Sequence, residues 1–167
     1  MNKKIAIILP YKEIYSKNSA AAASIWVKDY FSLSKLKDNT LIYGNLEYGL
    51  KPITRNFKNI KILNNVFSKN KAYIDFFYKE YQKLKFDIIE IHNRPEYLNF
   101  LIKKKVNSKL IFFFHNNPKD IRGSKSINER MFILENTSKI FFVSKWTMRK
   151  FFEGLPFNNK SNCEILY

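Results

Sequence analysis

The sequence predicts an α/β protein in which helices cover both faces of a Rossmann-like parallel sheet. Short apolar, β-branched or aromatic runs alternate with longer segments of helical period along the 167 residues. A hydrophobic content of 46% and an aromatic content of 17% are typical of a globular chain with a buried core. No internal repeat or low-complexity linker interrupts the alternation, so we expect one domain over residues 1–167.

The first half of the chain contains three strand patterns and two helix patterns. In chain order these are a strand at 4–10, a helix at 19–34, strands at 39–44 and 59–63, and a helix at 70–85. The last helix has the clearest period, which places Ile74, Phe77, Tyr78, Tyr81 and Leu84 on one face.

The second half repeats strand and helix three times before a final strand. The predicted elements are strands at 87–91, 109–114, 139–143 and 163–167, and helices at 95–105, 126–138 and 145–154. Pro95 suits a first helical turn, and Gly154 suits a helix end. Ser126 with Glu129 three residues later is a capping-box pattern.

Several classes of protein are excluded by what the sequence lacks. The apolar run at the N-terminus is too short for a signal peptide, and no run approaches the ~18 residues that cross a bilayer. The dinucleotide-binding glycine pattern, the P-loop and the G-x-S-x-G elbow are all missing. One cysteine, Cys163, and two histidines make neither an internal disulfide nor a good zinc site, so we expect a cytoplasmic protein without a metal or other cofactor.

The chain is strongly basic. It has 30 Lys and Arg against 14 Asp and Glu, a net charge of +16. Such a field attracts polyanions such as nucleic acid, anionic lipid or phosphorylated substrates. The alternative is compositional, because the lysines are scattered and the chain is rich in Lys, Asn, Ile and Phe, as an AT-rich coding sequence would give.

Both histidines of the chain follow an apolar strand and precede an asparagine. The first motif is "HNRP", which begins at His92, and the second is "HNNP", which begins at His115. Ligands of parallel α/β sheets bind beyond the carboxyl ends of the strands, where both motifs would lie. Imidazole and amide groups donate and accept hydrogen bonds, which suits a hydroxyl-rich ligand such as a sugar. The alternative is that each His-Asn pair only ends a strand and caps the next helix.

The start of the first predicted helix is small and uncluttered. Ser19, Ala20 and Ala21 would let backbone N–H groups approach a phosphate closely. The alternative is that this run of alanines simply favours a helix.

Together these segments resemble the N-terminal half of GT-B glycosyltransferases, in particular the bacterial retaining enzymes that build lipopolysaccharide, capsule and glycolipids. The resemblance rests on "EIHNRPE", "HNNPKDIRG", Glu129-Arg130 and the order of the strands, and it covers essentially the whole chain. It implies a metal-independent transfer of a sugar from a nucleotide-sugar to a glycan or lipid-linked acceptor.

The resemblance also implies roles for individual residues. His115 matches the histidine that contacts the transferred sugar, and Ser19 to Ala21 match the loop near the donor diphosphate, where the family usually has two glycines. The positions that match acceptor-binding or cleft-lining ones, or that could bind an acceptor anion, are His92, Asn93, Arg94, Asn116, Asn117 and Arg122.

The family's second half, which holds the nucleotide-sugar, has no counterpart in these residues. We therefore expect a fragment of a longer enzyme, inactive alone, that works in the cytoplasm or at the inner face of the cytoplasmic membrane. Residues 51–86 mix cations with aromatics and are a candidate surface for anionic lipid. Two alternatives stay open: a stand-alone sugar- or nucleotide-binding module, and a basic nucleic-acid-binding domain, although no specific nucleic-acid motif is present.

Overall fold

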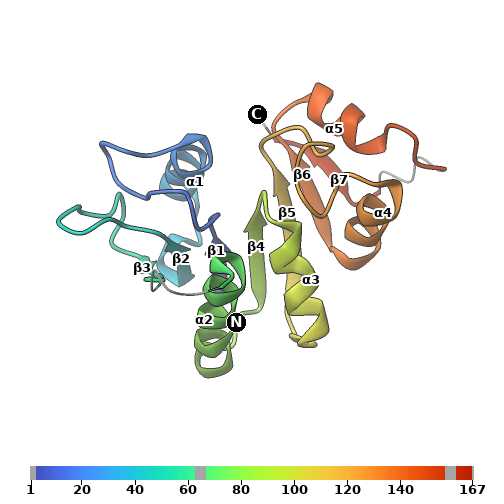
Figure 1. Cartoon of the computed structure of the whole chain (residues 1–167). Coiled ribbons are helices and arrows are strands. Elements are labelled where there is room, and N and C mark those ends of the chain that lie inside the picture. Colours follow the sequence, from blue (N-terminus) through green and yellow to red (C-terminus); the bar gives the residue numbers. More distant parts are fainter. Residues whose placement is uncertain (1–2, 63–66, 157–160, 167) are drawn as a thin grey trace. The chain divides into compact units, whose positions relative to one another are not determined.

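The computed structural model describes residues 3–62, 67–156 and 161–166. The chain forms two compact units, Met1–Ile89 and Glu90–Tyr167, and we describe each by itself. Each unit consists of parallel strands with helices packed on them (Figure 1).

The first unit begins with a strand and a helix. Its elements are β1 (Ile5–Ile8), α1 (Ala22–Leu33), the short 3-10 helix η1 (Lys37–Asn39), β2 (Thr40–Gly44), β3 (Phe57–Asn59) and α2 (Lys69–Leu84). The strands are parallel in the order β3-β2-β1, with Ile7 opposite Ile42 and Ile42 opposite Phe57. The strand β4 (Ile88–His92) starts in this unit, where the Ile88 N–H donates to the Lys4 carbonyl over 3.2 Å.

Helices cover both faces of the strands in this unit. Residues in register on neighbouring parallel strands share a face, and successive residues alternate between faces. On one face Ile7 and Ile42 share a buried cluster with Val27 of α1. On the other face Tyr43 meets Phe77 of α2 edge-on at 4.9 Å. The predicted Rossmann-like arrangement is therefore present at the level of this unit.

The second unit continues from β4 in simple succession. Its elements are α3 (Pro95–Lys103), β5 (Lys109–Phe114), α4 (Ile127–Asn136), β6 (Lys139–Phe142), α5 (Lys145–Phe152) and β7 (Cys163–Ile165). The order in space is β4-β5-β6-β7, the same as along the chain. Right-handed crossovers that all run in one direction place their helices on one face. There Phe114, Phe142 and Phe151 pack with ring centroids 5.3 to 5.6 Å apart.

The observed elements follow the predicted ones closely, with one misplaced strand. We predicted a strand at 59–63, whereas β3 is Phe57–Asn59; Leu63 lies outside the described residues. The reason is the partner strand, because β2 ends at Gly44, which pairs with Asn59, and no ladder remains for later residues. The predicted apolar face of α2 is also shorter than expected, since Leu84 at the helix end is 38% exposed.

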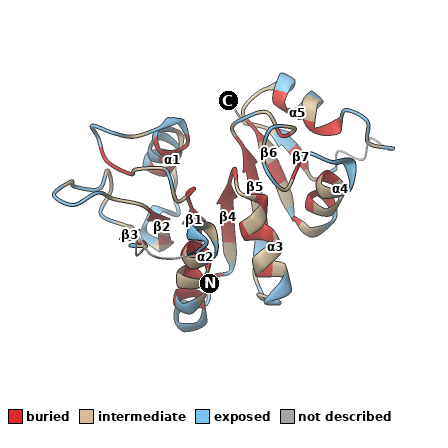
Figure 2. Cartoon of the chain, viewed as in Figure 1, coloured by how far each residue is buried: buried red, intermediate tan, exposed pale blue. Residues whose placement is uncertain are grey.

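The predicted capping box is confirmed at the start of α4. The Glu129 N–H donates to Ser126 Oγ over 3.2 Å, and the Ser126 N–H donates to the Glu129 carboxylate over 2.9 Å. Burial follows the strands, with β4 and β5 mostly buried along their length (Figure 2).

Two further properties hold for the described part of the chain. None of its helices combines the length and apolar character that crossing a membrane requires. Its His, Cys, Asp and Glu side chains nowhere gather in a group of three that could hold a metal ion.

Candidate functional site

The two histidines meet at one edge of the second unit. His92 is the last residue of β4, and His115 directly follows β5. Because β4 and β5 are parallel neighbours, their carboxyl ends lie together, and His92 Nδ1 is 2.8 Å from His115 Nε2. The His92 side chain is 0% exposed, whereas His115 is only partly buried. His115 is thus the member of the pair that a ligand can reach.

Aromatic packing fixes the orientation of the His92 ring. It stacks on Phe113 with centroids 4.5 Å apart and planes within 4°, and Phe113 stacks in turn on Phe141 at 5.0 Å. A ring held on its face by Phe113 and at its edge by His115 has little freedom to rotate. The orientation of His115 is therefore set from inside the protein.

Burial makes both histidines neutral near pH 7. It lowers the pKa of His115 to about 4, and it lowers the pKa of His92 well below the usual range, with a further decrease from the proximity of His115. A neutral imidazole has one N–H donor and one acceptor nitrogen. The pair therefore offers hydrogen bonds rather than positive charge, which suits hydroxyl groups.

Asn93 ties the two strand ends together. Its backbone has a φ of +52°, a left-handed conformation that Asn tolerates better than most residues. Its N–H donates to the Phe113 carbonyl over 2.9 Å, and its Oδ1 accepts the His115 N–H over 2.9 Å. Its Nδ2 donates to Asn116 Oδ1 over 3.0 Å. The structure thus brings four of the predicted residues, His92, Asn93, His115 and Asn116, into one connected cluster, which we call the His-Asn cluster.

The remaining predicted residues of this unit lie beside the His-Asn cluster with other contacts. Arg94 donates to the Asn93 carbonyl over 3.1 Å. The Asn117 amide closes its own turn, because Nδ2 donates to Asp120 over 2.9 Å and Oδ1 accepts the Lys119 N–H over 3.2 Å. Both amide atoms of Asn117 are thus used within the loop. Asn117 is therefore less available to a ligand than Asn116, which is exposed.

Arg122 is mostly exposed and pairs with a carboxylate. Its Nε lies 3.2 Å from Glu96 Oε1 in the first turn of α3. Exposed ion pairs of this kind contribute little to stability, so Arg122 can exchange Glu96 for an anionic ligand at small cost.

Glu90 is a residue that the sequence analysis missed. It stands two residues before His92 on β4, so both side chains point to the same face of the strand. Burial raises its pKa to about 8, and its Oε2 has no hydrogen-bond partner among the described residues. The signal was present, since an acidic residue within the apolar run Ile88–Ile91 must be buried if that run is a strand.

The predicted phosphate-approach residues belong to the first unit. Ala21 precedes α1 as its N-cap and provides no side-chain cap, which leaves that end open to an anion. Ala20 forms an isolated parallel bridge with Ile14, and the Ser19 N–H donates to the Ser16 carbonyl over 3.4 Å. Their proposed role at the donor diphosphate stays a prediction.

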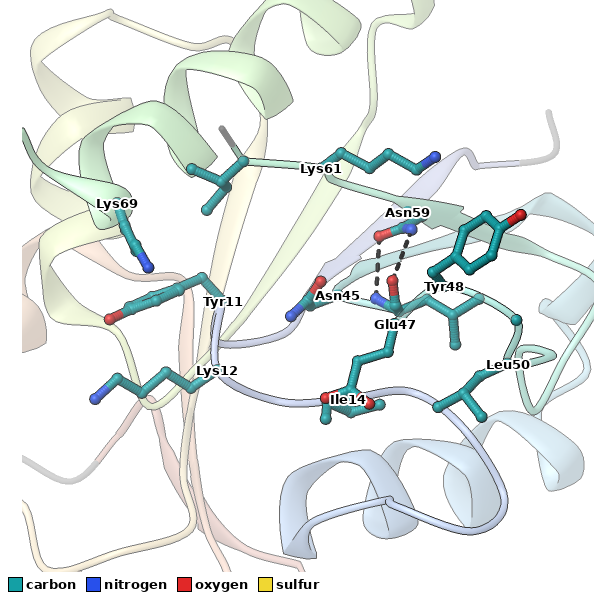
Figure 3. Close-up of a pocket in the computed structure, with 13 residues that line it drawn as sticks. Tyr11, Lys12, Ile14, Asn45, Glu47, Tyr48, Leu50, Asn59, Lys61 and Lys69 are labelled. Atoms are coloured by element: carbon teal, nitrogen blue, oxygen red, sulfur yellow. Dashed lines mark hydrogen bonds between the residues drawn. The ribbon is translucent and has the colours of Figure 1, made fainter. Parts of the chain in front are cut away.

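The first unit also contains a cavity that no sequence motif marked. Its volume is about 1210 Å³, and it lies where β1, β2 and β3 end (Figure 3). Its polar lining includes Lys12, Asn45, Asn59, Lys61 and Lys69. These residues come from the segments after β1, β2 and β3, from Asn59 at the end of β3 itself and from the start of α2, and none belongs to a spaced pattern in the sequence.

Neither a protein-family model nor a curated protein sequence matches the chain. Solved structures of the GT-B fold do match it in shape, at low sequence identity. One is a sucrose-phosphate synthase from Thermosynechococcus elongatus, with a TM-score of 0.65 and 10% identity over 98% of this chain and 47% of that one.

Two other similar structures are HepE from Anabaena in complex with UDP and glucose, and a UDP-N-acetylglucosamine 2-epimerase from Rickettsia bellii. HepE has a TM-score of 0.61 and 11% identity over 99% of this chain and 44% of its own. The epimerase has a TM-score of 0.58 and 13% identity, again over 99% and 44%. This chain spans less than half the length of each of these proteins. It therefore has the Rossmann-like α/β fold that forms one half of these GT-B structures.

Proposed function

We propose that this chain is the N-terminal, acceptor-side half of a glycosyltransferase that transfers a sugar from a nucleotide-sugar to a glycan or a lipid-linked acceptor. The observation that carries the proposal is the His-Asn cluster at the carboxyl ends of β4 and β5, in a chain with the fold of half a GT-B protein. Ligands of such sheets bind at this edge.

The chemistry of the cluster agrees with sugar transfer. His115 is neutral, partly exposed and held from behind by His92, so it can present a fixed hydrogen bond to a hydroxyl of the transferred sugar. Preorganised donors of this kind stabilise charge that develops at the reacting centre. Asn116, held by Asn93, would orient the same ligand. The chain's own residues need no metal for these steps.

The finer parts of the proposal rest on the resemblance and the charge. We assign retention of the anomeric configuration and a place in cell-envelope polysaccharide or lipopolysaccharide synthesis. The net charge of +16 supports work at the inner face of the cytoplasmic membrane on anionic, lipid-linked acceptors.

The experiment is a transfer assay with the product of the complete coding frame. UDP-, GDP-, ADP- and CMP-linked sugars are incubated with a membrane extract, and release of the nucleotide is measured. His115→Ala should lower turnover by about 100-fold or more, as loss of one preorganised donor does. Its free energy of unfolding should change much less, because the substituted ring is partly exposed.

A matched control is Lys103→Gln, an exposed position at the end of α3. It should transfer sugar at the rate of the unaltered enzyme. If the unaltered enzyme consumes none of the nucleotide-sugars, the proposed function is refuted. If His115→Ala leaves turnover unchanged, His115 is not part of the site.

A further inference from the structure

A buried carboxyl group lies beside the His-Asn cluster on β4. Glu90 is 4% exposed, and His92 two residues later is 0% exposed. Alternate residues of a strand point to the same face, with Cα atoms about 6.6 Å apart at 3.3 Å per residue. His92 stacks on Phe113, so the neighbouring strand contributes an apolar ring to this face. Glu90 is therefore the polar side chain that precedes His92 on its own face of β4.

The Glu90 carboxyl group can donate a hydrogen bond near pH 7. Burial raises its pKa to about 8, so it keeps its proton at neutral pH. Its Oε2 is buried and makes no hydrogen bond to any described residue. Buried polar atoms in proteins nearly always have a partner, which Glu90 can reach by a change of rotamer or through one bridging water.

The hydrogen bond between the two histidines can run in either direction. His92 Nδ1 lies 2.8 Å from His115 Nε2, and either nitrogen can carry the shared proton. Burial lowers the pKa of both rings, so each has a single N–H near pH 7. If His92 Nδ1 donates, the proton of His115 is on Nδ1; if His115 Nε2 donates, its Nδ1 is an acceptor. The tautomer of His92 thus decides what His115 presents to a ligand.

A hydrogen bond from Glu90 to His92 selects one of these directions. When the acid O–H donates to His92 Nε2, the proton of His92 is on Nδ1, which donates to His115 Nε2. The opposite arrangement, with His92 Nε2–H donating to Glu90, would leave the buried acid proton without this acceptor, which is costly. A bridging water keeps the favoured direction, because it accepts from Glu90 and donates to His92.

The backbone holds His115 in place for such a role. Its N–H donates to Asn93 Oδ1 over 2.9 Å, and the Asn93 N–H donates to the Phe113 carbonyl over 2.9 Å. The His115 side chain is only partly buried. Because Nε2 bonds to His92, Nδ1 is the ring nitrogen through which His115 can meet a ligand.

We propose that Glu90 is a positioning residue, which holds His92 in the Nδ1–H tautomer and thereby makes His115 a hydrogen-bond donor, through Nδ1–H, to an oxygen atom of the bound sugar. The inference rests on the proposed function for the ligand, and it adds the direction of the hydrogen bond and the residue that sets it. A donor stabilises an oxygen on which negative charge develops, whereas an acceptor nitrogen would repel it. Glu90 itself touches no ligand.

The first test needs no substrate, so its failure and the failure of the proposed transfer reaction are separate results. The complete protein is labelled with ¹⁵N in its histidine side chains, and long-range ¹H–¹⁵N spectra distinguish protonated from unprotonated ring nitrogens. The variant His115→Gln assigns the signals by their loss. At pH 7 we expect the proton on Nδ1 of both His92 and His115. A proton on Nε2 of His92 would overturn the inference.

Three variants test whether Glu90 sets this tautomer. Glu90→Leu removes the donor and keeps an apolar side chain of similar size, so the Nε2–H form of His92 should appear. Glu90→Gln, whose amide N–H can replace the acid donor, should keep the Nδ1–H form. The matched control is Ile91→Val, a buried position on the opposite face of β4, which should also keep it. Unchanged tautomers in Glu90→Leu, or the same change in Ile91→Val, would contradict the role of Glu90.

Sugar transfer by the same variants is the second test. Glu90→Leu should lower kcat about tenfold or more, because an imidazole in the wrong tautomer fails at its step, while KM for the nucleotide-sugar changes less than about twofold. Glu90→Gln and Ile91→Val should stay within about threefold of the unaltered enzyme, and melting curves are recorded for all variants.

The two tests together separate the outcomes. If Glu90→Leu changes the tautomer of His92 and still transfers sugar at the unaltered rate, the direction of the bond has no role in transfer and the inference is wrong. If Ile91→Val loses as much activity as Glu90→Leu, the loss is structural and the inference is again wrong. If the unaltered enzyme transfers no sugar, the proposed function fails, and the spectra alone decide whether Glu90 sets the tautomer.

Discussion

At the scale of single residues, the buried Glu90 and His92 and the partly buried His115 all have shifted pKa values. Glu90 and His92 lie on one face of β4, and His92 contacts His115. Burial raises the pKa of Glu90 to about 8 and lowers the pKa of His115 to about 4. All three side chains are therefore mainly neutral near pH 7, and each shift links protein stability to pH.

Above pH 6.5, the pH dependence of the free energy of unfolding should report the ionisation of Glu90. Because its pKa is higher in the folded state, the unfolded chain releases the proton first, and stability is lost as pH rises from about 4.5 through 8. The histidines act in the opposite direction, and only below pH 6.5. Between pH 6.5 and 8 the loss should be about 2 kcal/mol, at 1.36 kcal/mol per pH unit.

Urea unfolding of Glu90→Gln at four pH values in this interval is the measurement. The variant should show a flat profile and should equal or exceed the unaltered protein in stability at pH 8. Glu135→Gln, at an exposed position of α4, should keep the original slope. A flat profile in the unaltered protein would show that Glu90 is ionised or hydrated in the folded state.

The sequence predicted the members of the His-Asn cluster but not which of its two histidines is accessible to a ligand. Strand-end position placed His92 and His115 at one edge, because parallel neighbouring strands end together. It could not show that His92 is fully buried while His115 is not, since that depends on the stack with Phe113. The cavity residues were missed for a related reason: they meet only after three loops converge, and loop convergence leaves no period in the sequence.

At the scale of elements, Arg130, which follows the capping glutamate of α4, links two segments of the second unit. The Arg130 side chain is buried, and it donates to the carbonyls of Lys125 over 2.6 Å, Ser124 over 3.4 Å and Glu153 over 2.7 Å. It thus holds the segment between β5 and α4 against the end of α5. That segment carries Asn116 and Arg122, so Arg130 supports the candidate site without touching a ligand.

Replacing Arg130 by Met should lower the free energy of unfolding by about 3 kcal/mol, because one buried and two partly buried carbonyls lose charge-assisted donors. Limited trypsin digestion should then cut faster after Lys119, Arg122 and Lys125, which lie in the released segment. Arg149→Met, an exposed position on α5, should stay within about 0.5 kcal/mol of the unaltered protein. Equal stability of the two variants would mean that the carbonyls find water or other donors.

At the scale of the whole molecule, ion pairs within the protein do not neutralise the excess of positive charge. Glu80 and Glu153 each pair with two lysines, whereas the exposed Lys71 and Lys79 have no ion pair among the described residues. The candidate lipid surface at 51–86 contains both of these lysines; its residues 63–66 lie outside the described part of the chain.

A vesicle pelleting assay tests whether this positive charge binds the protein to anionic membranes. Phosphatidylglycerol vesicles should retain the protein, phosphatidylcholine vesicles should not, and 0.5 M salt should release it, because screening acts within a few ångströms there. At ~1 kcal/mol per lysine near an anionic surface, Lys71→Gln/Lys79→Gln should weaken binding by about 30-fold. Lys103→Gln/Lys109→Gln removes equal charge from the second unit and should have a much smaller effect if 51–86 is the contact surface. Equal weakening by both pairs would mean that the net charge of the whole protein, and not the surface at 51–86, drives binding. If the protein shows no preference for the anionic lipid, its positive charge is explained by base composition alone.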